Sequence, residues 1–261
     1  MIAHDMMDQP PDDTAAPYVS VVVPAYNEEG RITESLKKIA DYFEGKDYAF
    51  EVVVTNDGSK DRTLEICRAF ATDHPWLRVI HYDANRGKGY AVRTGMMNAR
   101  GEHCLLCDAD LATPMEQLDG FWDHVRDGFD VVIASRAVHG SHLDRRQPAY
   151  RELAGRMFNL SVRLLAVRGI HDTQCGFKLF RREAAQTIFP LCTLNGFSFD
   201  IEVLHVAQRL GYRIREAGVH WHHCPGSKVK VLRDGMRMLR DLVMIRLRHR
   251  NLRRHAADRP R

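Results

Sequence analysis

A chain of 261 residues is long enough to bury a complete hydrophobic core, and 44% hydrophobic with 28% charged residues is typical of a globular protein. The formal net charge of +4 at pH 7 is compatible with an anionic partner but does not identify one. No apolar run approaches about 18 residues, so we expect no transmembrane helix. The polar residues 1–17 lack the features of a signal peptide and are expected to form a disordered tail.

The cysteines are expected to be reduced thiols buried in the core. All six lie at irregular spacing within apolar stretches, which is typical of a cytosolic protein. Cys104 and Cys107 have the spacing of a redox pair, but a strand would direct them to opposite faces. We therefore do not expect redox chemistry at this pair.

Apolar, β-branched runs alternate with helical patterns through the first half of the chain. We predict strands at 18–23, 50–55, 77–82, 103–107 and 131–134. Between them we predict helices at 32–43, from Asp61 as N-cap to about 70, at 90–99, and from about Pro114. This alternation predicts an α/β fold with a mostly parallel sheet flanked by helices. Its ligand crevice would lie at the carboxyl ends of the strands.

The pattern changes after Arg136. We predict a loop at 139–148, a strand at 176–181, and helices at 150–167, 199–210 and 231–250. The helices at 150–167 and 231–250 are amphipathic and rich in arginine. They could pack on the sheet with solvated arginines, and they also suit the surface of an anionic bilayer. We expect one domain over 18–230, followed by a basic amphipathic helix and tail over 231–261.

Two carboxylates, Asp108 and Asp110, directly follow the apolar strand 103–107. An extended chain directs residues i and i+2 to the same side, so the two charges would repel unless a hard divalent cation lay between them. The pair is a candidate metal site. An acidic turn at a strand end is the alternative.

Three further polar clusters follow predicted strands. They are Pro24-Ala25-Tyr26-Asn27-Glu28, Asn56-Asp57-Gly58-Ser59 and Asn85-Arg86-Gly87-Lys88-Gly89. Lys88 at a helix start opposes the helix dipole, and a nearby phosphate would relieve this. The chain lacks a P-loop, and no Gly-x-Gly-x-x-Gly follows the first strand, which argues against a dinucleotide oxidoreductase. Each cluster alone is compatible with an ordinary turn, but their order after successive strands favours a ligand site.

These clusters resemble those of the inverting family 2 glycosyltransferases, which have the Rossmann-like GT-A fold and use nucleotide sugars. The second half narrows the resemblance. Residues 172–180 (Asp-Thr-Gln-Cys-Gly-Phe-Lys-Leu-Phe), 226–228 (Gly-Ser-Lys) and 241–248 are similar to dolichyl- and polyprenyl-phosphate β-glucosyltransferases, relatives of dolichol-phosphate mannose synthase. The resemblance extends from about residue 18 to 250.

The resemblance implies roles for residues of the donor site. Asp108 and Asp110 would hold Mg²⁺ or Mn²⁺ on the diphosphate, with Asp110 also assigned to catalysis. Lys88 and Arg136 would contact donor phosphates. The residues expected in the nucleoside pocket, with the last facing the base, are Pro24, Ala25, Tyr26, Glu28 and Asp57.

On the acceptor side the resemblance implies a catalytic Asp172, which would orient the acceptor or the anomeric centre, or accept a residual proton. Gln174, Ser227 and Lys228 are assigned to the acceptor or its phosphate. The histidines and cysteine of 220–224 could suggest zinc, but strand alternation would separate His222 from His223. A diphosphate contact, or a supporting role behind the ligands, is favoured for one of these histidines.

Two departures from the family pattern bear on specificity. Asn56 replaces the usual first aspartate of Asp-Asp-Gly-Ser, and Ala112 stands where mannosyl-type enzymes carry a metal-binding glutamine. The second departure favours UDP-glucose over GDP-mannose. We expect metal-dependent transfer of glucose to dolichyl or polyprenyl phosphate. GDP-mannose as donor, or a soluble or polysaccharide acceptor in cell-envelope glycan synthesis, remains the alternative.

A lipid-phosphate acceptor without a membrane span predicts a particular location. We expect a peripheral protein on the cytoplasmic face, held at an anionic membrane surface by its basic amphipathic helices. A nucleic-acid partner would explain the C-terminal arginines but not the acidic strand ends, so none is expected. The sequence leaves the oligomeric state open.

Overall fold

The computed structural model of the chain describes residues 16–138, 141–143, 162, 166–222 and 231–252. Most of the predicted tail 1–17 and of the predicted helix 150–167 lies outside the described residues, as do Ser227 and Lys228. None of the helices in the described part of the chain combines the length and apolarity needed to cross a lipid bilayer.

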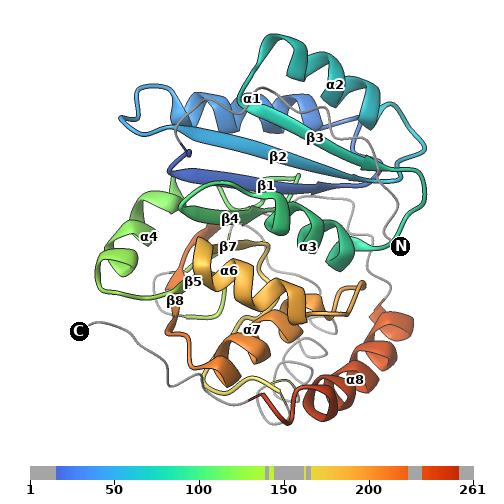
Figure 1. The fold of residues 1–261 in the computed structure, drawn as a ribbon, viewed down its shortest axis with the longest axis vertical. Coiled ribbons are helices and arrows are strands. Elements are labelled where there is room, and N and C mark those ends of the chain that lie inside the picture. The colour runs from blue at the N-terminus through green and yellow to red at the C-terminus, as the bar shows by residue number, and fades with distance from the viewer. Residues whose placement is uncertain (1–15, 139–140, 144–161, 163–165, 223–230, 253–261) are drawn as a thin grey trace.

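A seven-stranded sheet forms the centre of the molecule (Figure 1). Its strand order is β3 (Leu77–Tyr82), β2 (Phe50–Asp57), β1 (Val19–Ala25), β4 (His103–Cys107), β7 (Phe177–Arg181), β5 (Val131–Ser135) and β8 (Ile214–Gly218). All pairings are parallel except those of β7, which runs antiparallel to both β4 and β5. The predicted mostly parallel α/β sheet is confirmed.

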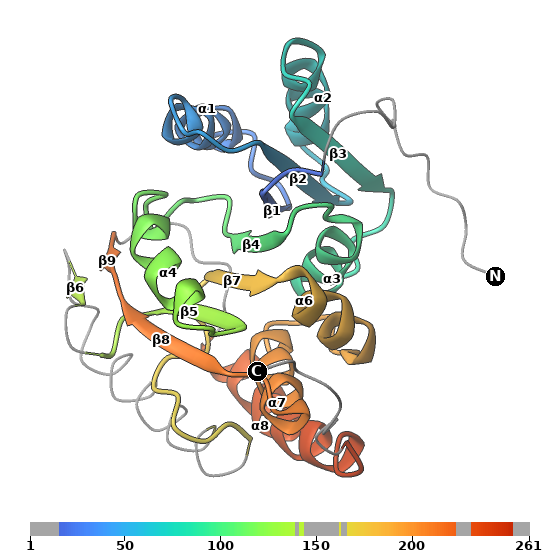
Figure 2. The same cartoon turned by 60° about the vertical axis from the view of Figure 1, so that its left-hand side comes forward.

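Helices cover both faces of this sheet (Figure 2). The core of one face includes side chains from α1 (Ile32–Phe43), α2 (Thr63–Asp73) and α4 (Gln117–Arg126). The core of the other includes side chains from α3 (Lys88–Asn98), α6 (Arg182–Ile188), the 3₁₀ turn η1 (Phe189–Leu191), α7 (Phe199–Leu210) and α8 (Val231–Arg248). The two-residue strands β6 (His142–Leu143) and β9 (His220–Trp221) pair separately.

Alternation along the central strands separates the two cores. In β1, Val21 and Val23 belong to one core while Val22 belongs to the other. Cys104 and Cys107 of β4 likewise lie on opposite faces, as predicted. All the cysteines in the described residues are buried and free.

Several predicted boundaries are confirmed and others are corrected. The strands 77–82 and 103–107 and the helices 32–43 and 199–210 have the predicted bounds. Asp61 was predicted as the N-cap of α2, but the N-cap residue is Arg62; Asp61, one residue earlier, accepts a hydrogen bond from the backbone N–H of Thr63 at 3.0 Å. Pro114 does not open a helix: it lies in the turn before α4, where its carbonyl accepts from the N–H of Gln117 at 3.1 Å.

The second half contains three strands that the sequence did not reveal. β8 has no continuous apolar run because its residues are only partly buried at the sheet edge. β6 lies within the predicted loop 139–148, and its two residues pair with β9. Such short strands carry no periodicity that a sequence pattern could detect.

Candidate active site

Hydrogen bonds join the polar clusters after β1 and β2, residues 24–28 and 56–59. We call these two clusters together the rim. The Asn27 N–H donates to Ser59 Oγ at 3.0 Å, and the Lys60 N–H donates to Asn27 Oδ1 at 2.8 Å. The Glu28 N–H donates to Thr63 Oγ1 at 2.7 Å. Asn27 has a φ of 52°, a left-handed conformation that asparagine tolerates better than most residues. These bonds fix the two clusters to each other.

Asp57 fixes the third cluster to this rim. Its side chain is buried and accepts hydrogen bonds from the backbone N–H groups of Arg86 at 2.7 Å and Gly87 at 2.9 Å. It also accepts from Asn85 Nδ2 at 2.9 Å. Gly87 has a φ of 99°, which favours glycine at this turn. Asp57 thus holds the loop 85–87 through both of its carboxylate oxygens.

Lys88 connects the third cluster to the acidic pair. Its Nζ lies 2.7 Å from Asp108 Oδ1 and 2.9 Å from Asp108 Oδ2. Burial alone would lower the pKa of Lys88, but the charges of Asp108 and Asp200 outweigh it and raise the pKa above its ordinary value. The side chain is therefore a fixed cation at the start of α3.

Asp108 and Asp110 are presented on a tightly held loop. The carbonyl of Ala109 accepts from Ser35 Oγ of α1 at 2.6 Å, and Asp110 Oδ1 accepts from the Ala112 N–H at 3.1 Å. Burial, with the charge of Asp108, raises the pKa of the Asp110 carboxyl. The two acids thus repel each other, and a divalent cation bound between them would relieve that repulsion.

The donor set of this loop fits Mg²⁺ or Mn²⁺, since both are hard cations that prefer carboxylate oxygens. Within the described residues no group of three or more His, Cys, Asp or Glu side chains is arranged to hold a metal. A cation held by Asp108 and Asp110 could take further oxygen ligands from a bound diphosphate. His223 and Cys224, part of the histidine cluster, lie outside the described residues.

The segment 172–176 lies against the loop 108–110, which we call the acidic loop. The Asp108 N–H donates to the Gly176 carbonyl at 3.1 Å, because β7 runs beside β4. Asp172 is buried, and its carboxylate pairs with Arg136 through Nε at 2.7 Å and Nη2 at 2.9 Å. It also accepts from the Arg136 backbone N–H at 3.0 Å.

These contacts decide what Asp172 can do. Burial alone would raise the pKa of its carboxyl, but the charge and hydrogen bonds of Arg136 outweigh burial and hold the pKa below its usual range. Such a carboxylate is a weak proton acceptor. The geometry thus favours orientation, through Arg136, over proton transfer. The guanidinium of Arg136 also lies 5.4 Å from the ring centroid of Trp221.

Residues 20–189 match the family model described as glycosyl transferase family 2. The chain belongs to this family. It is 35% identical over 244 residues to the dolichyl-phosphate beta-glucosyltransferase of Dictyostelium discoideum, a match that covers 89% of this chain and 75% of that protein. It is 36% identical over 256 residues to the Homo sapiens protein of the same name, covering 91% and 77%.

The fold is also similar to solved structures. One is glucosyl-3-phosphoglycerate synthase from Mycobacterium tuberculosis in complex with Mn²⁺, UDP-glucose and glycerol 3-phosphate, with a TM-score of 0.62 at 22% identity. That likeness covers 89% of this chain and 80% of the other. At this identity it shows a shared fold, and the GT-A fold is confirmed. The chain is a glycosyltransferase.

The structure brings most of the predicted site residues of this glycosyltransferase together. Hydrogen bonds join Asn27 to Ser59 and Asp57 to the loop 85–87, and Lys88 beside that loop pairs with Asp108, whose N–H donates to Gly176. Pro24 and Tyr26 are partly exposed on the rim. The side chain of Ala25 is buried in the core, so it cannot line a pocket and only its backbone could contact a ligand. The Gln174 N–H donates to Asp172 Oδ1 at 3.2 Å.

Two buried charges below the site of this glycosyltransferase were not predicted. Lys178 Nζ in β7 donates to the Cys175 carbonyl at 2.5 Å and pairs with Asp200 of α7. A lysine between Phe177 and Phe180 in an apolar strand could have signalled a buried ion pair. Its partner could not be identified, because Asp200 comes from a different element.

Glu216 of β8 was also missed. It accepts hydrogen bonds from the backbone N–H groups of His171 at 2.9 Å and Asp172 at 2.8 Å. Glu216 thus holds the segment that carries Asp172. No feature of the sequence indicated that β8 would lie there, since β8 itself was not detected.

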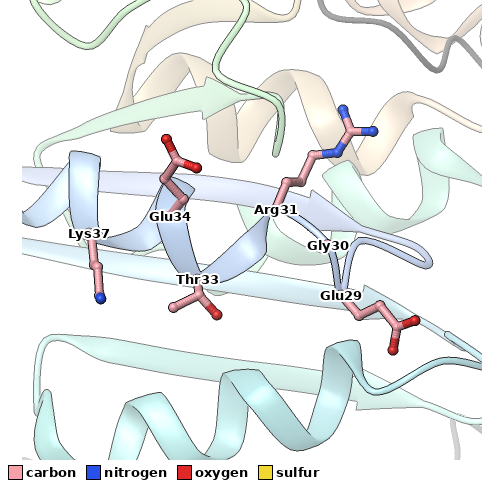
Figure 3. Close-up of a pocket in the computed structure, with 6 residues that line it drawn as sticks. All are labelled: Glu29, Gly30, Arg31, Thr33, Glu34 and Lys37. Atoms are coloured by element: carbon pink, nitrogen blue, oxygen red, sulfur yellow. The ribbon is translucent and has the colours of Figure 1, made fainter.

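A pocket at the start of α1 borders the rim, because its lining residue Arg31 pairs with Glu28 at 3.0 Å (Figure 3). It is lined by Glu29, Gly30, Arg31, Thr33, Glu34 and Lys37. All of these residues come from one segment. Arg31 and Glu34 point to one side of the helix while Thr33 and Lys37 point to the other. These side chains do not converge on a common point, so the pocket indicates no binding site.

Proposed function

We propose that this glycosyltransferase transfers glucose from UDP-glucose to a dolichyl or polyprenyl phosphate, with Mg²⁺ or Mn²⁺ as cofactor. The observation that carries the proposal is the identity of 35% and 36% to two dolichyl-phosphate beta-glucosyltransferases over about nine-tenths of the chain. The polar clusters after β1, β2, β3 and β4, and the segment 172–176, also lie within residues 20–189, which match the family model.

For the donor, the proposal assigns the nucleoside to residues 24–28 and 57 of the rim. The carboxylate of Asp57 is a hydrogen-bond acceptor, which suits an N–H of a pyrimidine base. Lys88 pairs with Asp108, and Arg136 pairs with Asp172 beside the acidic loop, so both would contact the donor phosphates. Ala112, in place of a glutamine, supports UDP-glucose over GDP-mannose.

Asp108 and Asp110 would hold the divalent cation, which when bound neutralises charge that develops on the leaving diphosphate. Lys88 adds a fixed ammonium beside the same carboxylates, so it is placed to neutralise a bound diphosphate as well. That a solved structure of the same fold holds Mn²⁺ with UDP-glucose is in keeping with this assignment.

The acceptor chemistry needs no strong base. An oxygen of the acceptor phosphate, already anionic near neutral pH, attacks the anomeric carbon and forms the new C–O bond. The bond to the UDP oxygen breaks, UDP leaves with the electron pair, and the configuration inverts. The lowered pKa of Asp172 is compatible with this scheme, since its role is to hold Arg136 and not to take a proton.

The proposal also places the protein at the cytoplasmic face of a membrane, where a lipid phosphate is found. Helix α8 buries Met238, Leu242, Ile245 and the following His249. Its opposite side exposes the stripe of Val243, Met244 and Leu247, at 52%, 38% and 56%. Arg240, Arg246 and Arg250 are exposed around this stripe. An apolar stripe framed by arginines suits an anionic lipid surface.

A panel of nucleotide sugars tested on a short polyprenyl phosphate, with and without Mg²⁺, tests the proposal. Metal-dependent transfer from UDP-glucose is the expected result. Transfer from GDP-mannose alone would move the donor assignment to the alternative. Activity that needs no lipid phosphate would replace the acceptor with a soluble or polysaccharide one. Absence of transfer from any nucleotide sugar would overturn the proposal.

A further inference from the structure

A short connection, residues 192–195, joins η1 to the segment before α7 and lies against the start of α3. We call it the strap. The Gly89 N–H donates to the Asn195 carbonyl at 2.8 Å. A Cβ built on Gly87 would lie 2.4 Å from the Asn195 carbonyl oxygen, and one on Gly89 would lie 2.3 Å from that of Leu194. The strap is therefore in direct contact with the two glycines that flank Lys88.

Glu202 of α7 holds the strap in place through hydrogen bonds. Its side chain is fully buried, and Oε2 accepts from the backbone N–H groups of Thr193 at 2.8 Å and Leu194 at 2.7 Å. Oε1 accepts from Thr193 Oγ1 at 3.1 Å and contacts Nε2 of His249, just after α8, at 2.9 Å. A buried carboxylate with this many partners fixes each of them closely.

Arg93 of α3 holds the strap from the other side. Its Nη1 donates to the Cys192 carbonyl at 3.0 Å and its Nη2 donates to Asn195 Oδ1 at 2.9 Å. The strap is thus clamped between α7 and α3. Any movement of the strap would shift the loop 87–89, and with it the position of Lys88 relative to Asp108.

We propose that Glu202 is a positioning residue for donor binding. It acts through the strap on the loop 87–89 and so sets where the Lys88 ammonium lies. The inference rests on the proposed function in one respect, since it takes Lys88 as a ligand of the donor phosphates. No sequence motif marked Glu202, because its partners lie in two other segments, the strap and the turn just after α8.

Glu202→Gln tests this. Its amide oxygen can replace only part of the carboxylate's accepting capacity, so we expect faster hydrogen exchange at the amides of 85–91. We also expect the KM for the nucleotide sugar to rise about 3- to 10-fold while kcat changes less than about twofold. The matched control is Glu51→Gln, because Glu51 is buried in β2 and accepts from Ser20, Arg78 and Arg100. It should lower stability and leave both readouts unchanged.

If Glu202→Gln does not fold, Arg93→Ala loosens the same strap from the partly exposed side and should give the same two changes. Unchanged exchange at 85–91, or an unchanged donor KM, in a folded variant of either kind would overturn the inference and leave Glu202 with a structural role only. The wild-type protein could prove to use no nucleotide sugar, and the proposed function would then be wrong. Faster hydrogen exchange at 85–91 in the variants would in that case still show that the strap fixes the loop 87–89.

Discussion

Gly176 leaves no room for a side chain beside Asp108. A Cβ built on Gly176 would lie 2.0 Å from Asp108 Oδ2 and 2.2 Å from Asp108 Cγ, distances that real atoms do not reach. The contact exists because β7 runs antiparallel beside β4 and begins where β4 ends and the acidic loop starts. The glycine of the 172–180 motif is therefore a requirement for the position of the proposed metal ligand.

Gly176→Ala should displace the Asp108 carboxylate and lower kcat/KM about 100-fold, since a shift of about 1 Å at a reacting centre has an effect of that size. Transfer assays and thermal unfolding would measure the change. Gly120→Ala is the matched control, because Gly120 lies in α4 with nothing within 4 Å of an added Cβ. The control should keep full activity and gain about 0.5–1 kcal/mol of stability. Equal activity in the two variants would show that the position of Asp108 is not critical.

Asp110→Asn should nearly abolish transfer while the fold survives. The substitution removes one of the two anionic oxygen ligands, and the leaving diphosphate loses part of its charge compensation. Because burial and Asp108 raise the pKa of Asp110, the ionised carboxylate costs stability near pH 7 when no metal is bound. The metal-free variant should therefore unfold at the same temperature as the wild type or slightly higher.

Asp123→Asn serves as a control for Asp110→Asn, since Asp123 is exposed on α4 and pairs only with the nearby Arg126 among the described residues. It should leave turnover unchanged. Unchanged turnover in Asp110→Asn, or full wild-type activity in excess EDTA, would contradict both the metal assignment and the role of Asp110.

Asp172→Asn should lower kcat about 100-fold while UDP affinity, measured by calorimetry, changes less than about threefold. The reason is that Asp172 holds Arg136 through both oxygens and lies beside the acidic loop and not in the nucleoside rim. Arg136→Lys loses the paired geometry as well, so the double variant should be no slower than the worse single one. A loss of UDP affinity comparable to the loss of turnover would show that Asp172 belongs to the donor site.

The ion pair of Asp172 and Arg136 also predicts a pH dependence of stability. The folded-state pKa of Asp172 is depressed, so its contribution is present above the unfolded value of about 3.9 and is lost as pH falls through the folded value. The difference in unfolding free energy between wild type and Asp172→Asn should be constant above about pH 5 and shrink below about pH 4. Denaturant unfolding across this range measures it. A difference that changes between about pH 5 and 8 would contradict the assigned pKa shift.

Reversal of Arg250, Arg253 and Arg254 to Glu should reduce co-sedimentation with anionic liposomes on the order of 100-fold, at about 1 kcal/mol for each arginine near the surface. Added salt should weaken wild-type binding in the same assay, because the attraction is screened. Reversal of the exposed Lys37, Arg68 and Arg126, on α1, α2 and α4, is the matched control. Normal sedimentation of the first variant at low salt would exclude docking through this end of the chain.

The sequence by itself determined the elements of the first half and the types of residue at their ends. Strands such as 103–107 are short apolar runs and helices such as 32–43 have one apolar face, so local periodicity is enough to place them. The order of polar clusters after successive strands also predicted that they meet at one edge of the sheet, since parallel strands end on the same side.

Only the tertiary structure decided how those clusters hold one another. Asp57 binds the loop 85–87 and Asp172 holds Arg136, and both contacts join elements far apart in the chain. Glu202 binds the nearby strap and also His249, which follows α8 much later in the chain. Nothing in the local sequence around an aspartate or glutamate distinguishes a carboxylate that binds a metal or substrate from one that holds another part of the protein in place. The distinction arises when a buried carboxylate must find donors, and the fold alone determines which donors are within reach.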